Sequence, residues 1–179
     1  MPPKNRGAEI KAAQDAALAS LPDRALYIIM HFRKQDDPSN FHWGYYYHRK
    51  NALGSKYHFQ NPGPGGQGWL PGHASTHGVF RSFALTAVIQ IAHVPVSKEA
   101  QLDAVMRSYD ESHTTIPNMS CRIWLLAVLK RLVEAGLVRC KSIDALEEEC
   151  RTIGAHHFSS ALKNEQPRPV VVSTTCEIT

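Results

Sequence analysis

The segment with the strongest structural signature is residues 41–49, FHWGYYYHR. It is dense in aromatic residues, which favour strands, and successive side chains of a strand point to opposite faces. Its odd positions from 41 to 47 are all aromatic, whereas its even positions include His42 and His48. We therefore expect a strand with one aromatic face that packs into a core and a second face that carries histidines.

Residues on both sides of this strand extend the expected sheet. RALYIIMHFR at 24–33 is rich in β-formers and predicts a buried strand, and SKYHFQ at 55–60 predicts the return strand of a hairpin. Residues 61–78 hold glycines and prolines at a density that predicts a long loop without regular elements, which could act as a lid. The apolar, β-branched residues 79–95 predict at least one further strand.

Helices are expected mainly in the second half of the chain. Residues 118–135 carry apolar side chains at helical spacing, with Asn118 or Ser120 as the cap and Gly136 as the end. Shorter helices are expected at 97–108 and 142–153. Hairpin-linked strands followed by helices indicate an α+β fold, with an antiparallel sheet of about four to five strands packed on a long helix. The expected domain organisation is a helical arm at 1–23, a single α+β domain at 24–158 and a tail at 159–179.

Composition argues against several classes of protein. The net charge is +4, but the basic residues occur as scattered pairs and not as the stripe typical of nucleic-acid binders. The four cysteines form no CxxC pair, so we expect no zinc site, and we expect neither a metal nor a cofactor. His73 and His77 are four residues apart, but in a loop and not on a helix. No apolar run reaches the length of a membrane span, and the first residues lack the apolar core of a signal peptide, so we expect reduced thiols and a cytoplasmic location.

Cys121 is the residue best placed for chemistry, because it opens the strongest predicted helix. The N–H groups of a first helical turn have no intrahelical partner, and the helix dipole adds positive charge there. Both effects stabilise a thiolate, and the same N–H groups can receive an oxyanion. A thiol nucleophile needs a base and a group that orients the base. His42 is the candidate base, and His58 on the adjacent strand is the candidate orienting group.

These residues also lie in motifs that resemble a known family. The sequence has HWGYY at 42–46, YH at 57–58 and NMSCRIW at 118–124. In this order the motifs resemble the lecithin:retinol acyltransferase family, a circularly permuted papain-like group, and also an uncharacterised fungal family with the pattern YHW…YH…NC.W. The resemblance implies a permuted papain-like fold, with His42 as base, His58 as orienting group and Cys121 as nucleophile.

The predicted function is therefore cysteine-dependent acyl transfer. The chain would be a hydrolase or an acyl or aminoacyl transferase that acts on an ester, thioester or amide, in small-molecule biosynthesis, with a small molecule or an acyl carrier as substrate. The residues predicted to bind substrate are Trp43, Tyr45, Trp69, Asn118 and Arg122.

Two alternatives remain open at this point. One is a non-catalytic binding or interaction module on the same fold. The other is a domain that binds RNA or DNA through Tyr45, Tyr46, Tyr47, Arg49 and Lys50.

Overall fold

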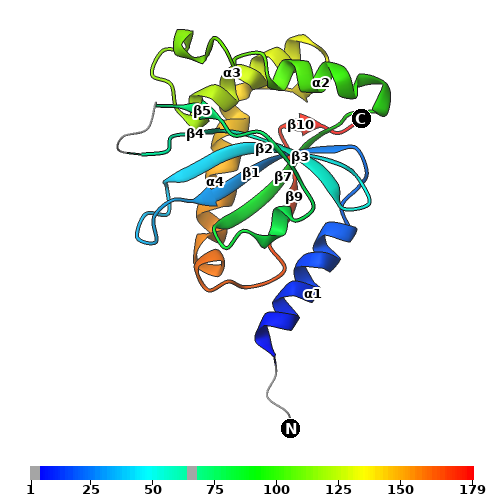
Figure 1. The fold of residues 1–179 in the computed structure, drawn as a ribbon, viewed down its shortest axis with the longest axis vertical. Coiled ribbons are helices and arrows are strands. Elements are labelled where there is room, and N and C mark those ends of the chain that lie inside the picture. Colours follow the sequence, from blue (N-terminus) through cyan, green and yellow to red (C-terminus); the bar gives the residue numbers. More distant parts are fainter. Residues whose placement is uncertain (1–4, 64–67) are drawn as a thin grey trace.

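A computed structural model describes residues 5–63 and 68–179. The fold is α+β, built on a six-stranded mixed sheet with the strand order β6-β3-β2-β1-β7-β9 (Figure 1). Neighbouring strands are antiparallel, except that β7 and β9 are parallel. The strands of this sheet are β1 (Ala25–Phe32), β2 (Phe41–Lys50), β3 (Leu53–Tyr57), β6 (Ala74–Thr76), β7 (Leu85–His93) and β9 (Val170–Val172).

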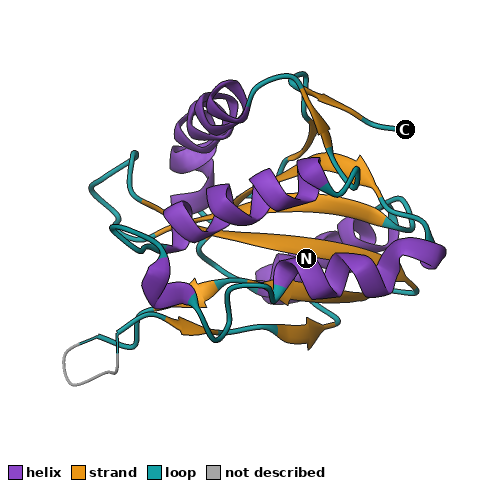
Figure 2. Cartoon of the chain, turned by 90° about the horizontal axis from the view of Figure 1, so that it is seen from above, coloured by secondary structure: helices purple, strands orange, loops and turns teal. Residues whose placement is uncertain are grey.

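The other elements lie around this sheet. Two short ribbons are formed by β4 (Phe59–Gln60) with β5 (Leu70–Pro71) and by β8 (Arg139–Cys140) with β10 (Cys176–Glu177). The helices are α1 (Arg6–Ala19), α2 (Glu99–Met106), α3 (Cys121–Glu134) and α4 (Ile143–Leu162). Three 3-10 turns also occur, η1 (Val79–Arg81), η2 (Val96–Lys98) and η3 (His113–Thr115). Helices lie on both sides of the strands (Figure 2).

The sheet separates two hydrophobic clusters. The larger cluster joins the aromatic face of β2 to α3 and α4, and includes Trp43, Tyr45 and Trp124. The smaller one lies on the opposite face, where Leu18 near the end of α1 and Leu21 just after it pack with Tyr27 and Tyr46. The predicted division of residues 41–49 into an aromatic face and a histidine face is thus confirmed.

The strongest predicted helix begins and ends as its sequence indicates. The Ser120 side chain caps α3 by accepting a hydrogen bond from the Ile123 N–H at 3.2 Å. Gly136 follows α3 with φ +66°, a left-handed conformation that costs glycine little. These two signals place Cys121 at the first helical position.

Three sequence predictions need correction. The helix expected to end at residue 153 continues to Leu162, and the expected tail supplies β9, which makes the sheet mixed instead of purely antiparallel. The expected loop at 61–78 contains β5 and β6. These short strands form because β5 pairs with β4 and β6 pairs with β3, which the local sequence does not predict. A lid role for this loop falls partly on residues 64–67, outside the described residues.

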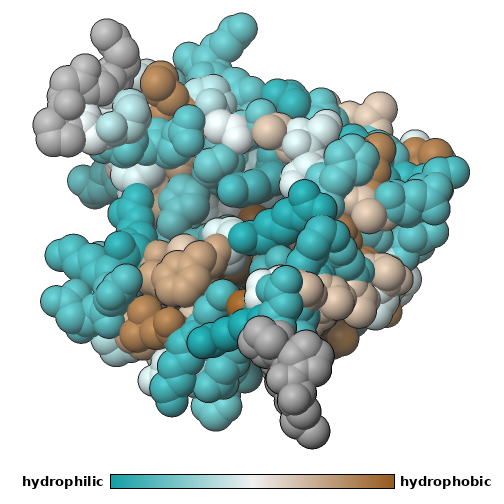
Figure 3. Space-filling model, turned by 60° about the horizontal axis from the view of Figure 1, so that its bottom comes forward, coloured by the Kyte–Doolittle hydropathy of each residue, from teal (hydrophilic) through white to brown (hydrophobic). Residues whose placement is uncertain are grey.

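Of the helices described, none combines the length and the apolar character required to cross a bilayer. On the face drawn in Figure 3, apolar residues lie in small groups between polar ones.

Candidate functional site

Cys121 lies against the larger core. Its exposed fraction is only 2%, and it belongs to the same cluster as Trp43 and Trp124. It nevertheless lines one wall of a surface cavity at the start of α3. The predicted position at a helix N-terminus is therefore confirmed, with most of the thiol covered.

The predicted histidines do come together. His42 Nε2 lies 2.8 Å from His58 Nδ1, so the two rings share one hydrogen bond. His31, directly opposite His42 in the β1–β2 register, lies beside them with a ring centroid distance of 6.3 Å. Burial and the neighbouring His58 lower the pKa of His42 to about 3, and burial and Lys56 lower that of His58 to about 4. The pair is thus neutral near pH 7.

The prediction that His42 is the base for Cys121 is wrong for this structure. Trp43 and Tyr45 of β2 point into the core shared with α3, so the alternation of the strand turns His42 to the other face of the sheet. Among the described residues, Cys121 Sγ makes no hydrogen bond to any imidazole. The sheet itself separates the thiol from the His42–His58 pair, and the catalytic roles assigned to these three residues are not assembled.

The cavity beside Cys121 is lined by groups that favour anions. It has a volume of about 300 Å³ and lies between the β1–β2 connection and the first turn of α3. Three arginines line it, together with the N-terminal end of α3, whose first N–H groups have no intrahelical partner. The lining residues are Arg33, Asp37, Ser39, Asn40, Phe41, Trp43, Ser120, Cys121, Arg122 and Arg151.

The charges around this cavity are partly balanced. Arg122 and Arg151 each donate to the same Glu147 oxygen at 2.8 Å, so one carboxylate serves two cations. Asp37 is held by the Ser39 hydroxyl and N–H, and these hydrogen bonds lower its pKa. Arg33 makes no ion pair within the described part of the chain, and its guanidinium carbon lies 5.8 Å from the centroid of the Trp69 ring. Three cations against two carboxylates leave the cavity positive.

The residues predicted to bind substrate differ in where they lie relative to the cavity. Trp43 and Arg122 line the cavity, and Trp69 lies over Arg33 beside it. Asn118, with φ +54°, occupies the exposed turn before α3 and does not line the cavity. The assignment of Tyr45 is wrong, because its ring is fully buried and its hydroxyl donates to the Leu125 carbonyl at 2.8 Å.

The residues named for nucleic-acid binding are also unsuited to it. Tyr45, Tyr46 and Tyr47 are all fully buried, so none offers a ring on which a base could stack. Arg49 is engaged in an ion pair with Glu99. The three tyrosines belong to the hydrophobic core, and Arg49 forms an ion pair at its edge.

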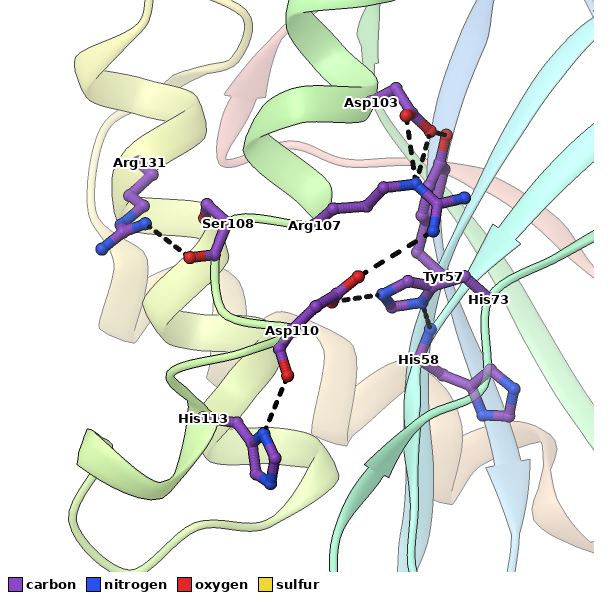
Figure 4. A network of polar contacts seen from close by, with 9 residues as sticks. All are labelled: Tyr57, His58, His73, Asp103, Arg107, Ser108, Asp110, His113 and Arg131. Carbon is purple, nitrogen blue, oxygen red and sulfur yellow. Dashed lines mark hydrogen bonds and ion pairs between the residues drawn. The ribbon is translucent and has the colours of Figure 1, made fainter.

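Sequence reasoning missed the most connected histidine of the fold. His73 accepts a hydrogen bond from the His58 N–H at 3.1 Å and lies 2.9 Å from Asp110 (Figure 4). Because Nδ1 accepts, Nε2 carries the hydrogen that it donates to Asp110. The ring packs at an angle against the rings of Tyr57, Phe59 and Trp124, and its side chain is 2% exposed. Both nitrogens are occupied, so His73 joins the chain at His58 to the loop after α2.

Arg33 and Arg151 were missed as well. Arg33 follows a strand and Arg151 lies within a predicted helix, and no local signal shows that they share a cavity with Cys121. In the described ranges, no three histidine, cysteine or acidic side chains are grouped closely enough to hold a metal ion. A scan of family models, a search of curated proteins and a search of solved structures found no match to this chain.

Proposed function

We propose that this chain is a binding module for a small molecule that bears a phosphate or carboxylate group, held in the cavity at the start of α3. The observation that carries the proposal is the convergence of three arginines on the N-terminal end of a 14-residue helix. Free N–H groups and the helix dipole favour an anion at such an end, and guanidinium groups add charge-assisted hydrogen bonds.

The shape of the cavity limits the size of the ligand. A volume of about 300 Å³ lies at the lower end of ordinary ligand sites. Phe41 and Trp43 supply apolar lining, while Arg33 also lines the cavity and has no ionic partner among the described residues. An anionic group on a small apolar or aromatic body matches both surfaces.

Binding of phenyl phosphate, followed by calorimetry at low ionic strength, tests this proposal. Phenylacetate replaces the phosphate with a carboxylate, and benzyl alcohol serves as the neutral control. Arg33→Gln should weaken phenyl phosphate binding about tenfold, since one charge-assisted hydrogen bond contributes about 1.5 kcal/mol. Added salt should weaken binding further.

Arg81→Gln is the matched control variant. It removes the same charge from an exposed side chain on η1, whose nearest carboxylate is 3.9 Å away. Binding should be unchanged in this variant. Equal loss in both variants, or equal binding of benzyl alcohol, would show that the cavity does not select anions.

Cysteine-dependent acyl transfer, on the permuted papain-like arrangement implied by the sequence resemblance, is a second candidate function. It is favoured by one observation, which is that Cys121 lines the same cavity. Neither His42 nor His58 can be its base in this arrangement, so the ligand itself or a different side chain would have to take the thiol proton.

Alkylation kinetics separate the two candidates. Iodoacetamide modifies thiolates, so an activated nucleophile reacts faster than an ordinary thiol. We expect Cys121 to react no faster than the more exposed Cys140, as a binding module predicts. Preferential modification of Cys121, suppressed by phenyl phosphate, would favour the enzyme.

A further inference from the structure

Two thiols face each other at the C-terminal end of the chain. Cys176 on β10 lies directly opposite Cys140 on β8 in antiparallel register, and both cysteines are free. Directly opposed residues of antiparallel strands have Cα atoms about 4.5–5.5 Å apart. A disulfide accepts Cα separations of about 4.4–6.8 Å. The register thus already provides the spacing that a disulfide requires.

The surrounding hydrogen bonds hold this spacing without a covalent bond. Glu149 on α4 accepts from the Ser173 hydroxyl at 2.6 Å and from the Thr174 N–H at 2.7 Å. The Lys141 N–H donates to the Thr175 carbonyl at 3.2 Å. The last strand is therefore fixed beside β8, and its cysteine is presented in one position.

The two thiols differ in access. Cys140 is partly exposed, and its Sγ donates to the Ser142 carbonyl at 3.1 Å. Cys176 is 7% exposed, and burial, together with the neighbouring Cys140, raises its pKa to about 12. A reagent from solution reaches Cys140 first, and Cys176 stands behind it as the resolving thiol.

We propose that Cys140 and Cys176 form an oxidation site that closes to an intramolecular disulfide by exchange with a low-molecular-weight disulfide of the glutathione type. The Cys140 thiolate attacks one sulfur of the reagent, whose S–S bond breaks and releases one thiol. The Cys176 thiolate then attacks the Cys140 sulfur of the mixed disulfide and releases the second thiol. The protein loses two electrons and two protons, and the reagent disulfide is reduced to two thiols.

The bond would fix the wall of a second cavity. A space of about 250 Å³ is lined by Arg139 and Glu177, which are adjacent to the two cysteines, by Thr179, by His93 at the end of β7 and by Lys98 of η2. Reduced β10 is held there without a covalent bond, by two residue pairs with β8 and by the hydrogen bonds of Glu149 and Lys141. Oxidation would convert this short ribbon into a covalent clamp, independently of the anion site at α3.

The experiment uses the full chain incubated with glutathione disulfide, then quenched in acid, alkylated and analysed by intact mass and peptide mapping. We expect the loss of two hydrogen masses and a peptide that links Cys140 to Cys176. Cys150, fully buried on α4, is the third thiol of this region and the natural competitor. Cys150→Ser should keep the link, and Cys140→Ser should lose it.

Three results would overturn the proposal. These are a stable mixed disulfide on Cys140 without the internal link, a link from Cys140 to Cys150, or no oxidation of the folded protein. The peptide map of the oxidised chain without substitutions decides between these results. The conclusion therefore does not depend on whether the variants fold.

Discussion

The neutral His42–His58 pair predicts a specific loss of stability in acid. Both imidazoles have pKa values in the folded state, about 3 and about 4, that lie below the ordinary value of 6.5. The unfolded chain therefore binds more protons than the folded chain as the pH falls below 6.5. The stabilisation is complete above the unfolded pKa and is lost as the pH falls toward the folded values.

The magnitude follows from proton linkage. Consider a histidine that titrates normally in the unfolded chain and stays neutral in the folded chain. Between about pH 7.5 and about pH 5, such a histidine lowers the free energy of unfolding by about 2 kcal/mol. This figure applies to His42, and it barely changes with the folded pKa as long as that value stays below 5. His58 is more exposed, so solvent screening reduces its contribution to about 1 kcal/mol. The pair should cost about 3 kcal/mol in total.

The matched variant replaces both rings with amides. His42→Gln with His58→Asn keeps polar atoms near Nε2 and Nδ1, where the 2.8 Å hydrogen bond lies, but removes the titration. Urea unfolding at both pH values gives the free energy of unfolding for each protein. The native chain should lose about 3 kcal/mol more than the double variant. His31 is present in both proteins, so its own effect cancels.

An exposed histidine provides the control. His77→Gln, which removes an exposed imidazole outside the pair, should lose as much stability in acid as the native chain. If the native chain and the double variant lose equal free energy between the two pH values, the pair is not buried in its neutral form. The packing assigned to this face of the sheet would then be wrong.

Substitutions at three further positions test the packing of the fold. Ser120→Ala removes the cap of α3 and should cost about 1 kcal/mol in urea unfolding, whereas Ser120→Asp should retain the stability. Gly54→Ala places a Cβ 2.3 Å from the buried Tyr46 ring and should cost about 1–3 kcal/mol, so an unchanged unfolding midpoint would contradict this contact. Arg168 is 2% exposed and donates to the Phe83, Ser160 and Glu165 carbonyls, so Arg168→Met should lower stability by about 3 kcal/mol, as measured by thermal and urea unfolding.

The sequence by itself determined the local elements. Alternation in residues 41–49 predicted which side chains enter the core, because strand geometry gives each residue a fixed side. Ser120 and Gly136 predicted the ends of α3, because caps act through neighbouring backbone groups. The contact between His42 and His58 was also accessible, since the two lie on adjacent strands of one predicted hairpin.

Only the tertiary structure decided what these elements bring together. Whether α3 packs on the aromatic face or on the histidine face of β2 is not encoded in either segment, and this choice separates Cys121 from His42. Three other contacts also join residues that are distant in sequence. β9 pairs with β7, Arg33 and Arg151 line one cavity, and Cys140 lies opposite Cys176 in the β8–β10 register. Local periodicity determines the side of a strand or helix to which a side chain points. Which residue of another element it then contacts depends on how the whole chain packs.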